Sequence, residues 1–311
     1  MHDQGNILQK IKAKAKELGF LDCAVLPVSE LFEEKEHLTN WLKNEMHGQL
    51  NYMARNVDKR LNPKLLVGNA KSIIIVLLNY YTQQTQTDCE APVISKYAYG
   101  TDYHFVLKDK LKYLLSFIQT EIKPCNARTF TDSAPILERA WARRAGLGWI
   151  GKNSNLISVT HGSFFFIGEI VLDVELPYDE PNQVRNHCGT CTRCIDACPT
   201  KAILADCVVD ARKCISYQTI EVKGSLDENL KGQFENRIFG CDICQDVCPW
   251  NLKSKPHNEL YFEPHSDLLQ LSKNEWYQIE LPLFNTLFKN SAVKRTGFSR
   301  LKRNLQFIQH K

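Results

Sequence analysis

The chain has 311 residues, of which 43% are hydrophobic and 24% charged, a globular composition that excludes extensive disorder. Its longest uninterrupted apolar run, residues 73–78, is far shorter than the ~18 residues that span a bilayer. The N-terminus also lacks the basic start and apolar centre of a secretory signal. We therefore expect a soluble protein of the cytoplasm that has no contact with a membrane.

The net charge of +4 is unevenly distributed. Glu280 is the last acidic residue, so the 39 basic and 35 acidic residues divide into a charge of −3 up to residue 280 and +7 beyond it. The seven cations are Lys289, Lys294, Arg295, Arg300, Lys302, Arg303 and Lys311. Such an end predicts a polyanionic partner, although a solvated tail is the common alternative. Phe298 and Leu301 lie among these charges, which favours an ordered element that binds phosphates.

The predicted elements of residues 1–180 mix helices and strands. Apolar residues spaced three or four apart predict helices, and β-branched or aromatic runs predict strands. In chain order, we expect a helix at 7–18, strands at 21–28 and 72–78, helices at 104–122 and 136–145, and a strand pair at 156–160 and 164–174. This order predicts an α+β domain over residues 1–180.

The cysteine spacing that follows predicts an iron–sulfur site. Cys188, Cys191, Cys194 and Cys198, with Pro199 after them, have the spacing C-x2-C-x2-C-x3-C-P. Bacterial two-cluster ferredoxins use this run, and its fourth cysteine ligates the other [4Fe–4S] cluster. A zinc ribbon is the alternative, but it uses two separated C-x2-C pairs. Residues 181–256 are poor in large apolar residues and would need such a group in order to fold.

A second cysteine run is one ligand short. Cys241, Cys244 and Cys248 repeat the pattern, but Ile238 takes the place of its first cysteine. Two clusters need eight thiolates, so the eighth comes from Cys207 or Cys214, and we favour Cys214 because it leads into a predicted helix. By crossover, one cluster is expected on Cys188, Cys191, Cys194 and Cys248, and the other on Cys198, Cys214, Cys241 and Cys244. We interpret Cys207 as a small buried residue and Cys23, Cys89 and Cys125 as structural.

Several segments together resemble the epoxyqueuosine reductase family, in order from about residue 5 to residue 305. They are R-L-N-P-K-L-L at 60–66, Y-A-Y-G-T-D-Y-H at 97–104, D-S-A-P-I-L-E-R at 132–139, G-W-I-G-K-N at 148–153, C-I-S-Y at 214–217 and G-C-D-I-C-Q-D-V-C-P-W at 240–250. The resemblance implies a cobalamin-dependent iron–sulfur enzyme that reduces epoxyqueuosine to queuosine at the wobble position of tRNA. An external flavodoxin- or ferredoxin-type donor would supply its electrons, and we expect a monomer.

The resemblance also implies a domain organisation. A nitroreductase-like cobalamin-binding domain is expected at 1–180, a ferredoxin-like domain with two [4Fe–4S] clusters at 181–256, and a short helical, basic region at 257–311. Many members continue into a C-terminal helical-repeat domain, which we do not expect in these 311 residues.

By the same resemblance, Asp132 is the expected proton donor, since opening an epoxide leaves an alkoxide that a positioned acid can protonate. An ordinary residue before a helix is the alternative interpretation. The resemblance also implies that cobalamin binds base-off. The sequence agrees, since Leu107 stands where a D-x-H-x-x-G signature beginning at Asp102 and His104 would have its glycine. The expected cofactor pocket comprises Arg60, Tyr97, Asp132, Arg139, Lys152, Asn153, Leu156, Ser216 and Asp242. Trp141 and Trp149 are expected in the core.

Two other classes of protein remain as alternatives. A reductive dehalogenase-like enzyme that acts on a small molecule would share the clusters and the cobalamin, but would not need the basic end. A simple ferredoxin-type carrier would need only residues 181–256 and would leave the first domain without a role.

Overall fold

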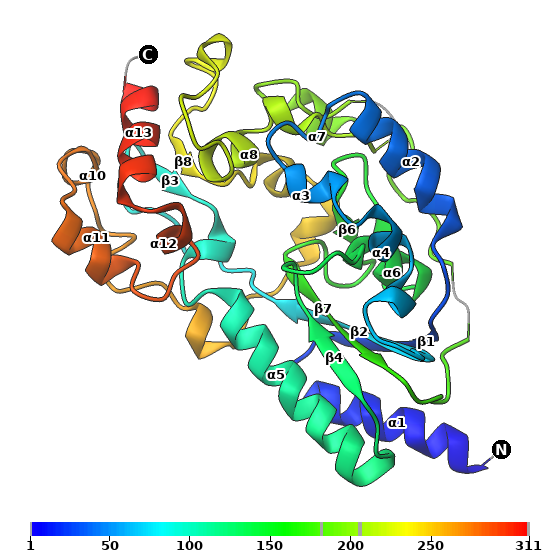
Figure 1. Cartoon of the computed structure of the whole chain (residues 1–311). Coiled ribbons are helices and arrows are strands. Elements are labelled where there is room, and N and C mark those ends of the chain that lie inside the picture. Colours follow the sequence, from blue (N-terminus) through cyan, green and yellow to red (C-terminus); the bar gives the residue numbers. More distant parts are fainter. Residues whose placement is uncertain (1, 181–182, 205–206, 310–311) are drawn as a thin grey trace.

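A four-stranded antiparallel sheet lies at the centre of the first half of the chain (Figure 1). The computed structural model describes residues 2–180, 183–204 and 207–309, with side chains from residue 5 onward. The sheet has the order β1-β2-β7-β4, formed by Asp22–Pro27, Ser72–Asn79, Phe165–Leu172 and Ala127–Phe130. The predicted strands at 21–28 and 72–78 are thereby confirmed, and β2 is buried along almost its whole length.

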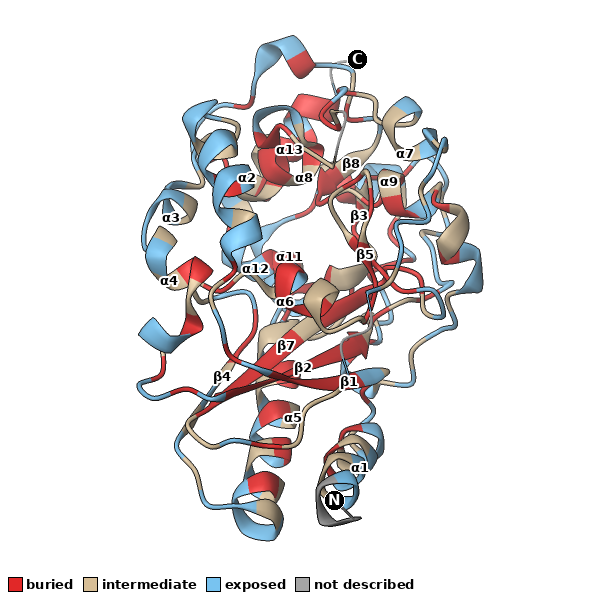
Figure 2. Ribbon diagram, turned by 90° about the vertical axis from the view of Figure 1, so that its right-hand side faces the viewer, coloured by how far each residue is buried: buried red, intermediate tan, exposed pale blue. Residues whose placement is uncertain are grey.

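Helices cover both faces of this sheet, which explains the continuous apolar sequence of β2 (Figures 1 and 2). Helix α1 (His2–Glu17) and helix α5 (Tyr103–Phe117) pack on one face, and α5 continues into a π-helical turn at Ile118–Ile122. On the other face lies α6 (Glu138–Arg144), with α4 (Val57–Leu61) and α2 (Phe32–Lys43) beside it. The helices expected at 7–18, 104–122 and 136–145 are therefore confirmed.

Strands form within both expected segments, 156–160 and 164–174, but their expected pairing is wrong. Around the turn expected between them there is only an isolated antiparallel bridge between Ser158 and Gly162 among the described residues. Strand β6 (Leu156–Ile157) pairs with β5 (Trp149–Ile150), while β7 pairs with β2 and β4. The reason is Gly148, because a Cβ there would lie 2.2 Å from the carbonyl oxygen of Ile157. Only glycine lets the two backbones approach so closely, and this approach gives β6 a nearer partner.

The second half of the chain consists of short elements around the cysteine loops. Its helices are α7 (Arg193–Asp196), α8 (Ile215–Ile220), α9 (Ile243–Asp246), α10 (Lys273–Tyr277), α11 (Leu281–Leu287), α12 (Val293–Thr296) and α13 (Phe298–Gln309). Short 3-10 helices lie at Pro63–Leu65, Lys96–Ala98, Ala211–Lys213, Glu228–Leu230, Pro249–Lys253 and Leu260–Phe262, and α3 is Asn51–Ala54.

One hydrophobic core joins segments that are far apart in sequence. Strand β3 (Val93–Ile94) pairs in parallel with β8 (Arg237–Phe239), and both pack with α8, α10, α11 and α13. The core thus combines residues from all three expected segments, so residues 257–311 do not have a core of their own. The expected boundary at residue 181 lies outside the described residues.

The basic end is ordered as far as it is described. Leu301, Asn304 and Leu305 of α13 are buried, and the Asn304 amide donates to the carbonyls of Thr219 and Ile238, each at 2.8 Å. Arg303 donates to the carbonyl of Val222 at 2.7 Å. Some of the basic side chains therefore donate hydrogen bonds to backbone carbonyls of the fold. Lys311 lies outside the described residues, and none of the described helices is long and apolar enough to cross a membrane.

Candidate active site and cluster-binding loops

Four cysteines surround a cavity of about 50 Å³ beside β6: Cys188, Cys191, Cys194 and Cys248. The first three precede or begin α7, and Cys248 follows α9. Burial raises the pKa of the Cys194 thiol, and its neighbours Cys188, Cys248 and Cys191 raise it further. The structure thus brings together the four cysteines that the crossover pattern predicts for one cluster.

Hydrogen-bond donors surround this cavity as well. The indole N–H of Trp149 points at the Cys188 sulfur from 3.5 Å, and Lys152 Nζ donates to the carbonyls of Gly189 at 2.8 Å and Cys191 at 3.1 Å. Such donors stabilise the negative charge of a bound cluster and raise its reduction potential. Trp149 is buried, as predicted, and Lys152 contacts the cluster loop.

The other four predicted cysteines also lie close together. Burial raises the pKa of Cys244 well above its usual value, and the thiols of Cys241 and Cys214 add to this effect. Cys214, the residue before α8, interacts in turn with Cys198. Among the described residues, no three His, Cys, Asp or Glu side chains could hold a single metal ion. A cubane is larger, because each of its thiolates binds a different iron.

Cys207 is less buried than the sequence predicts. It is half-buried rather than buried, and its sulfur faces the carbonyl of Ile150 at 3.6 Å. Of the other cysteines interpreted as structural, Cys23 is buried but Cys89 is exposed.

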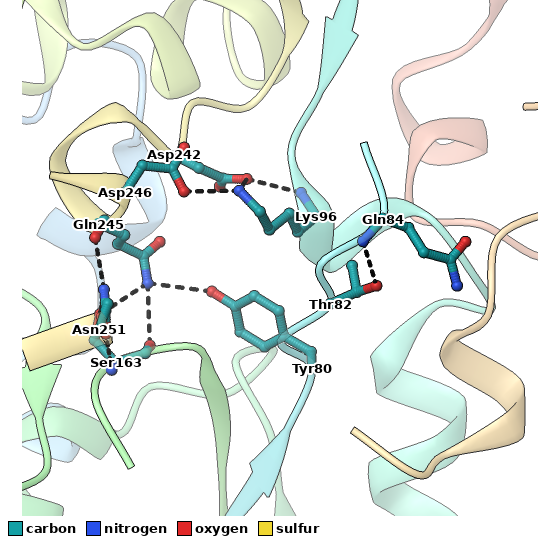
Figure 3. Close-up of polar contacts among 9 residues, drawn as sticks. All are labelled: Tyr80, Thr82, Gln84, Lys96, Ser163, Asp242, Gln245, Asp246 and Asn251. Carbon is teal, nitrogen blue, oxygen red and sulfur yellow. Dashed lines mark hydrogen bonds and ion pairs between the residues drawn. The ribbon is translucent and has the colours of Figure 1, made fainter. Parts of the chain in front are cut away.

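A buried polar network connects the second cysteine loop to the end of β2 (Figure 3). The Gln245 amide on α9 donates to the Tyr80 hydroxyl at 3.3 Å and to the Ser163 carbonyl at 3.0 Å. The Asn251 amide donates to the Gln245 carbonyl at 2.7 Å. Asp242 accepts from the backbone N–H of Lys96 at 2.8 Å. Because these buried groups are all paired, they fix the loop of Cys241 and Cys244 against the sheet.

Asp132 lies two residues beyond β4, with its carboxyl held by the first turn of α5. Its backbone has a φ of 53°, which is uncommon for a residue with a side chain. The Tyr103 hydroxyl donates to Asp132 Oδ2, and His104 Nε2 lies 3.7 Å from the same oxygen. The other ring nitrogen of His104 contacts Asp102 Oδ1 at 2.7 Å. The Asp132 side chain remains 60% exposed and so is accessible to a substrate.

The pKa shifts of Tyr103 and Asp102 indicate which of the two carries a proton. Burial raises the pKa of Tyr103 far above its usual range, and the charge of Asp132 raises it further, so Tyr103 remains a donor. Burial alone would raise the pKa of Asp102, but hydrogen bonds from His104 outweigh burial and lower it. Asp102 is therefore a carboxylate at neutral pH, and it fixes the orientation of the His104 ring.

Tyr97 lies between Asp132 and the second cysteine loop. Its ring packs against Tyr103, Phe166 and Phe239. Its hydroxyl interacts electrostatically with Asp132 and Asp242, and Asp242 is adjacent to the cysteine loop. Three expected pocket residues, Tyr97, Asp132 and Asp242, therefore face one region.

The remaining expected pocket residues are more dispersed. Asn153 donates to the Cys244 carbonyl at 3.3 Å, and Ser216 is half-buried on α8. Arg139 donates to the carbonyl of Ser154. The Leu156 side chain is buried in the core beneath the sheet, so only its backbone is available to a ligand.

Two buried carboxyls lie behind Asp132. Glu138 begins α6, and Glu169 is in the middle of β7 opposite Phe130 of β4. Arg60 is 6% exposed, donates to the Tyr52 carbonyl at 2.7 Å and interacts with Glu138. Burial raises the pKa of Glu138 to about 7, and the charge of Asp132 contributes to this rise.

Four of these neighbours were missed from sequence: Tyr103, His104, Glu138 and Glu169. One signal was present, because Glu169 is the only acidic residue in the apolar run of β7. The partners of Asp132 come from a helix almost thirty residues away, and no local pattern indicates this proximity.

Comparisons with known proteins agree with these observations. A family model described as "4Fe-4S double cluster binding domain" matches residues 187–251, and one described as "Epoxyqueuosine reductase QueG" matches residues 60–133. An epoxyqueuosine reductase of Cellulophaga algicola is 54% identical over 299 residues, which cover 96% of this chain and 97% of the relative.

Solved structures have the same fold. An epoxyqueuosine reductase with an epoxyqueuosine-modified stem loop of tyrosine tRNA matches with a TM-score of 0.88 at 27% identity, over 98% of this chain and 81% of that one. The Bacillus subtilis enzyme, described with its catalytic aspartate loop swung out of the active site, matches with a TM-score of 0.86 at 27% identity, with the same coverage. A catabolic reductive dehalogenase at 16% identity and a TM-score of 0.51 shares the fold alone. These matches confirm the predicted α+β fold with its double-cluster domain.

Proposed function

Because the chain belongs to the epoxyqueuosine reductase family, we propose that it reduces epoxyqueuosine in tRNA to queuosine with Asp132 as the proton donor. The observation that carries this proposal is the Asp132 carboxyl, which is largely exposed and is held by the Tyr103 hydroxyl. The loop that carries the catalytic aspartate in the Bacillus subtilis relative also supports this role for Asp132.

The chemistry requires two electrons and two protons. An epoxide that accepts them becomes an alkene, and its oxygen leaves as water. Asp132 would donate a proton to the oxygen as the carbon–oxygen bond breaks, which prevents an alkoxide from accumulating. Tyr103 and His104 would hold the carboxyl toward the substrate, and Asp102 would hold His104.

Electrons would enter from an external flavodoxin- or ferredoxin-type donor. Cys188, Cys191, Cys194 and Cys248 would hold the outer cluster, and Cys198, Cys214, Cys241 and Cys244 the inner one. Cobalamin, if held by the residues around Asp132 and the second cysteine loop, would supply low-potential cobalt for the reduction.

The residues around that region fit such a group. The rim of cobalamin carries primary amides, which need both hydrogen-bond donors and acceptors from the protein. The Asn153 side chain has two long bonds of 3.3 Å, one donated to the Cys244 carbonyl and one accepted from the Asn155 backbone N–H. The buried Nε of Arg60 has no partner among the described residues. Tyr97, Asp242, Lys152 and Ser216 complete the proposed pocket, together with Arg139 and the backbone of Leu156.

tRNA is the proposed partner, as in the relative solved with a modified stem loop. Arg295 of the basic end interacts electrostatically with Asp102 and Tyr52, so it lies near the mouth of the site. Phosphates of a bound stem loop could therefore contact the basic end while the modified base reaches Asp132. A tRNA substrate and thiolate-bound clusters fit a reducing cytoplasm.

The test is anaerobic reconstitution followed by iron, sulfide and cobalt analysis and by turnover of epoxyqueuosine-containing tRNA. We expect about eight irons and one cobalt per chain, and conversion to queuosine. A protein that binds no cobalt, or that dehalogenates small phenols and leaves the tRNA unchanged, would refute the proposal.

A further inference from the structure

The buried carboxyls behind Asp132 have no structural partner that explains them. Glu169 is 0% exposed, and neither of its carboxyl oxygens has a hydrogen-bond partner in the described part of the chain. By strand alternation it lies on the same face of β7 as Phe165 and Val171, which pack toward α6. Glu138, on α6, has a buried oxygen in the same unpaired state. Unpaired buried carboxylates are costly, so a proton or a water molecule must occupy this place.

The surroundings of the two carboxyls contain few charges. Around Glu138, the charged groups are Asp132 from the loop, Arg139 from its own helix, Arg60 from α4 and Glu169 from β7. Across the strands, Glu169 faces only Ile75 and Phe130. The Thr131 hydroxyl and the Trp141 indole N–H are also buried and unpaired among the described residues. A proton on this cluster therefore has polar groups around it but no fixed ion pair.

The two carboxyls differ in how readily they change charge. Burial raises the pKa of Glu169 well above its usual value, and the charges of Glu138 and Asp132 raise it further, so the neutral form of Glu169 is favoured. Burial and the neighbouring Asp132 raise the pKa of Glu138 to about 7, while the backbone N–H groups of Glu138 and Asp132 oppose the rise. Glu138 is therefore the group that gains and loses a proton near neutral pH, directly beside the Asp132 backbone.

This placement matters because one carboxyl carries one proton, whereas each turnover consumes two. We propose that Glu138 returns a proton to Asp132 within each turnover, and that Glu169 is its neutral neighbour. The inference rests on the proposed role of Asp132. In the balanced step, the Glu138 O–H bond breaks as the Asp132 O–H bond forms, directly or through one water, and bulk solvent then reprotonates Glu138. Electrons are supplied by the external donor and do not enter this step.

The test compares the steady-state rate against pH in the reconstituted enzyme and two variants. In the wild type, Glu138 is protonated below its pKa, so turnover falls as pH rises through about 7. Glu138→Gln should abolish this limb and lower turnover at acidic pH by ~10-fold, which is less than the ~10²–10⁴-fold effect of a direct general acid. Imidazole buffer, whose cation donates protons, should restore part of the rate. Glu169→Gln tests the neighbour separately: glutamine mimics a neutral acid, so the limb near pH 7 should remain.

A second measurement does not depend on turnover. The infrared band of a protonated carboxyl that titrates near neutral pH should be present in the resting protein and absent in Glu138→Gln. An unchanged rate and pH limb in Glu138→Gln would overturn the inference, and so would a uniform loss that imidazole does not restore. If Asp132→Asn is inactive while Glu138→Gln behaves as the wild type, only this inference fails. If Asp132→Asn is fully active, the proposed function of Asp132 fails first.

Discussion

Asp132 shows how much one residue can depend on distant neighbours. Its carboxyl is held by Tyr103, and the Tyr103 ring stacks on Phe166 of β7 with centroids 4.2 Å apart. Asp102 both caps α5, accepting from the His104 backbone at 3.0 Å, and fixes the His104 ring. The first turn of α5 therefore positions the proposed acid, and the sheet supports that turn.

Asp132→Asn is the direct test of this assignment. Asparagine keeps the size of the side chain and can still contact Tyr103, but it has no proton to transfer. We expect cobalt and iron content to stay at wild-type levels while turnover falls ~10²–10⁴-fold. The measurements are metal analysis and single-turnover conversion of epoxyqueuosine-containing tRNA. Normal turnover would exclude Asp132 as the acid, and lost cobalt would show that Asp132 is needed to bind the cofactor.

For single residues, the sequence identified Asp132 as a candidate acid but did not identify the residues that surround it. The D-S-A-P segment resembles a family motif and could be found by eye. Tyr103 and His104 have the sequence of an ordinary capped helix start, and only the fold brings them to Asp132. Glu138 belongs to the same motif, but it is buried only because α6 packs against β7. The wrong strand pairing predicted at residues 156–174 did not indicate this packing.

At the scale of elements, each of the two cysteine runs places one cysteine beside the other run. Cys248 lies with the first run and Cys198 with the second group, because α7 and α9 pack against each other. Sequence spacing predicted this exchange, since each run has a cysteine next to proline that points away from its own loop. The eighth ligand could be predicted only as a choice between two residues.

The ligand choice is tested by a matched pair of variants. Cys214 interacts with Cys198 and contributes to the environment of Cys244, whereas the Cys207 sulfur faces a backbone carbonyl. Cys214→Ala should therefore lower iron from about eight to about four per chain after reconstitution, while Cys207→Ala should leave it unchanged. Iron and sulfide analysis with electron paramagnetic resonance gives the result. The reverse pattern would assign the eighth ligand to Cys207.

Strand β5 gives a prediction about stability. Gly148 approaches the Ile157 carbonyl so closely that a methyl group there must displace backbone. Gly148→Ala should lower the free energy of unfolding by ~1–3 kcal/mol, the usual cost of overpacking, and weaken the wall of the outer cluster cavity. Gly68→Ala is the control, since nothing lies within 4 Å of its Cβ position. Denaturant unfolding compares the two, and equal stabilities would show that β5 adjusts without strain.

For the molecule as a whole, the shared core explains what the sequence could and could not predict. The composition shift near residue 180 and the cysteine runs indicated separate parts, but β3 pairs with β8 across 142 intervening residues. Parallel pairing of such short strands leaves no periodicity in sequence. The consequence for function is rigidity, because the polar network at Gln245 and the β3–β8 pair hold the loop of Cys241 and Cys244 in place relative to Asp132.

The basic end has two kinds of cation. Arg300, Lys302 and Arg303 donate to backbone carbonyls of Ile220, Tyr277 and Val222, and burial lowers the pKa of Arg303 to about 10. Their removal would damage the fold whether or not tRNA binds. Lys289, Lys294 and Arg295 are exposed instead, on or just before α12, and Arg295 is near Asp102. We therefore expect Lys289, Lys294 and Arg295, rather than the other three cations, to bind phosphates.

The corresponding variant neutralises Lys289, Lys294 and Arg295 together. Each lost phosphate contact should reduce the slope of log affinity against log salt by ~0.7–0.9, and tRNA affinity should fall most at low salt. The control neutralises three exposed lysines, Lys10, Lys16 and Lys123. They lie on α1 and just after the π-helical turn that follows α5, on the face of the sheet opposite α6 (Figure 1). Both variants change the net charge equally, so a general charge effect would lower their affinities alike. If the α12 variant alone has a flatter salt slope, the tRNA lies over α12 and the mouth of the Asp132 site. If its slope and affinity match the wild type, the basic end has no part in binding.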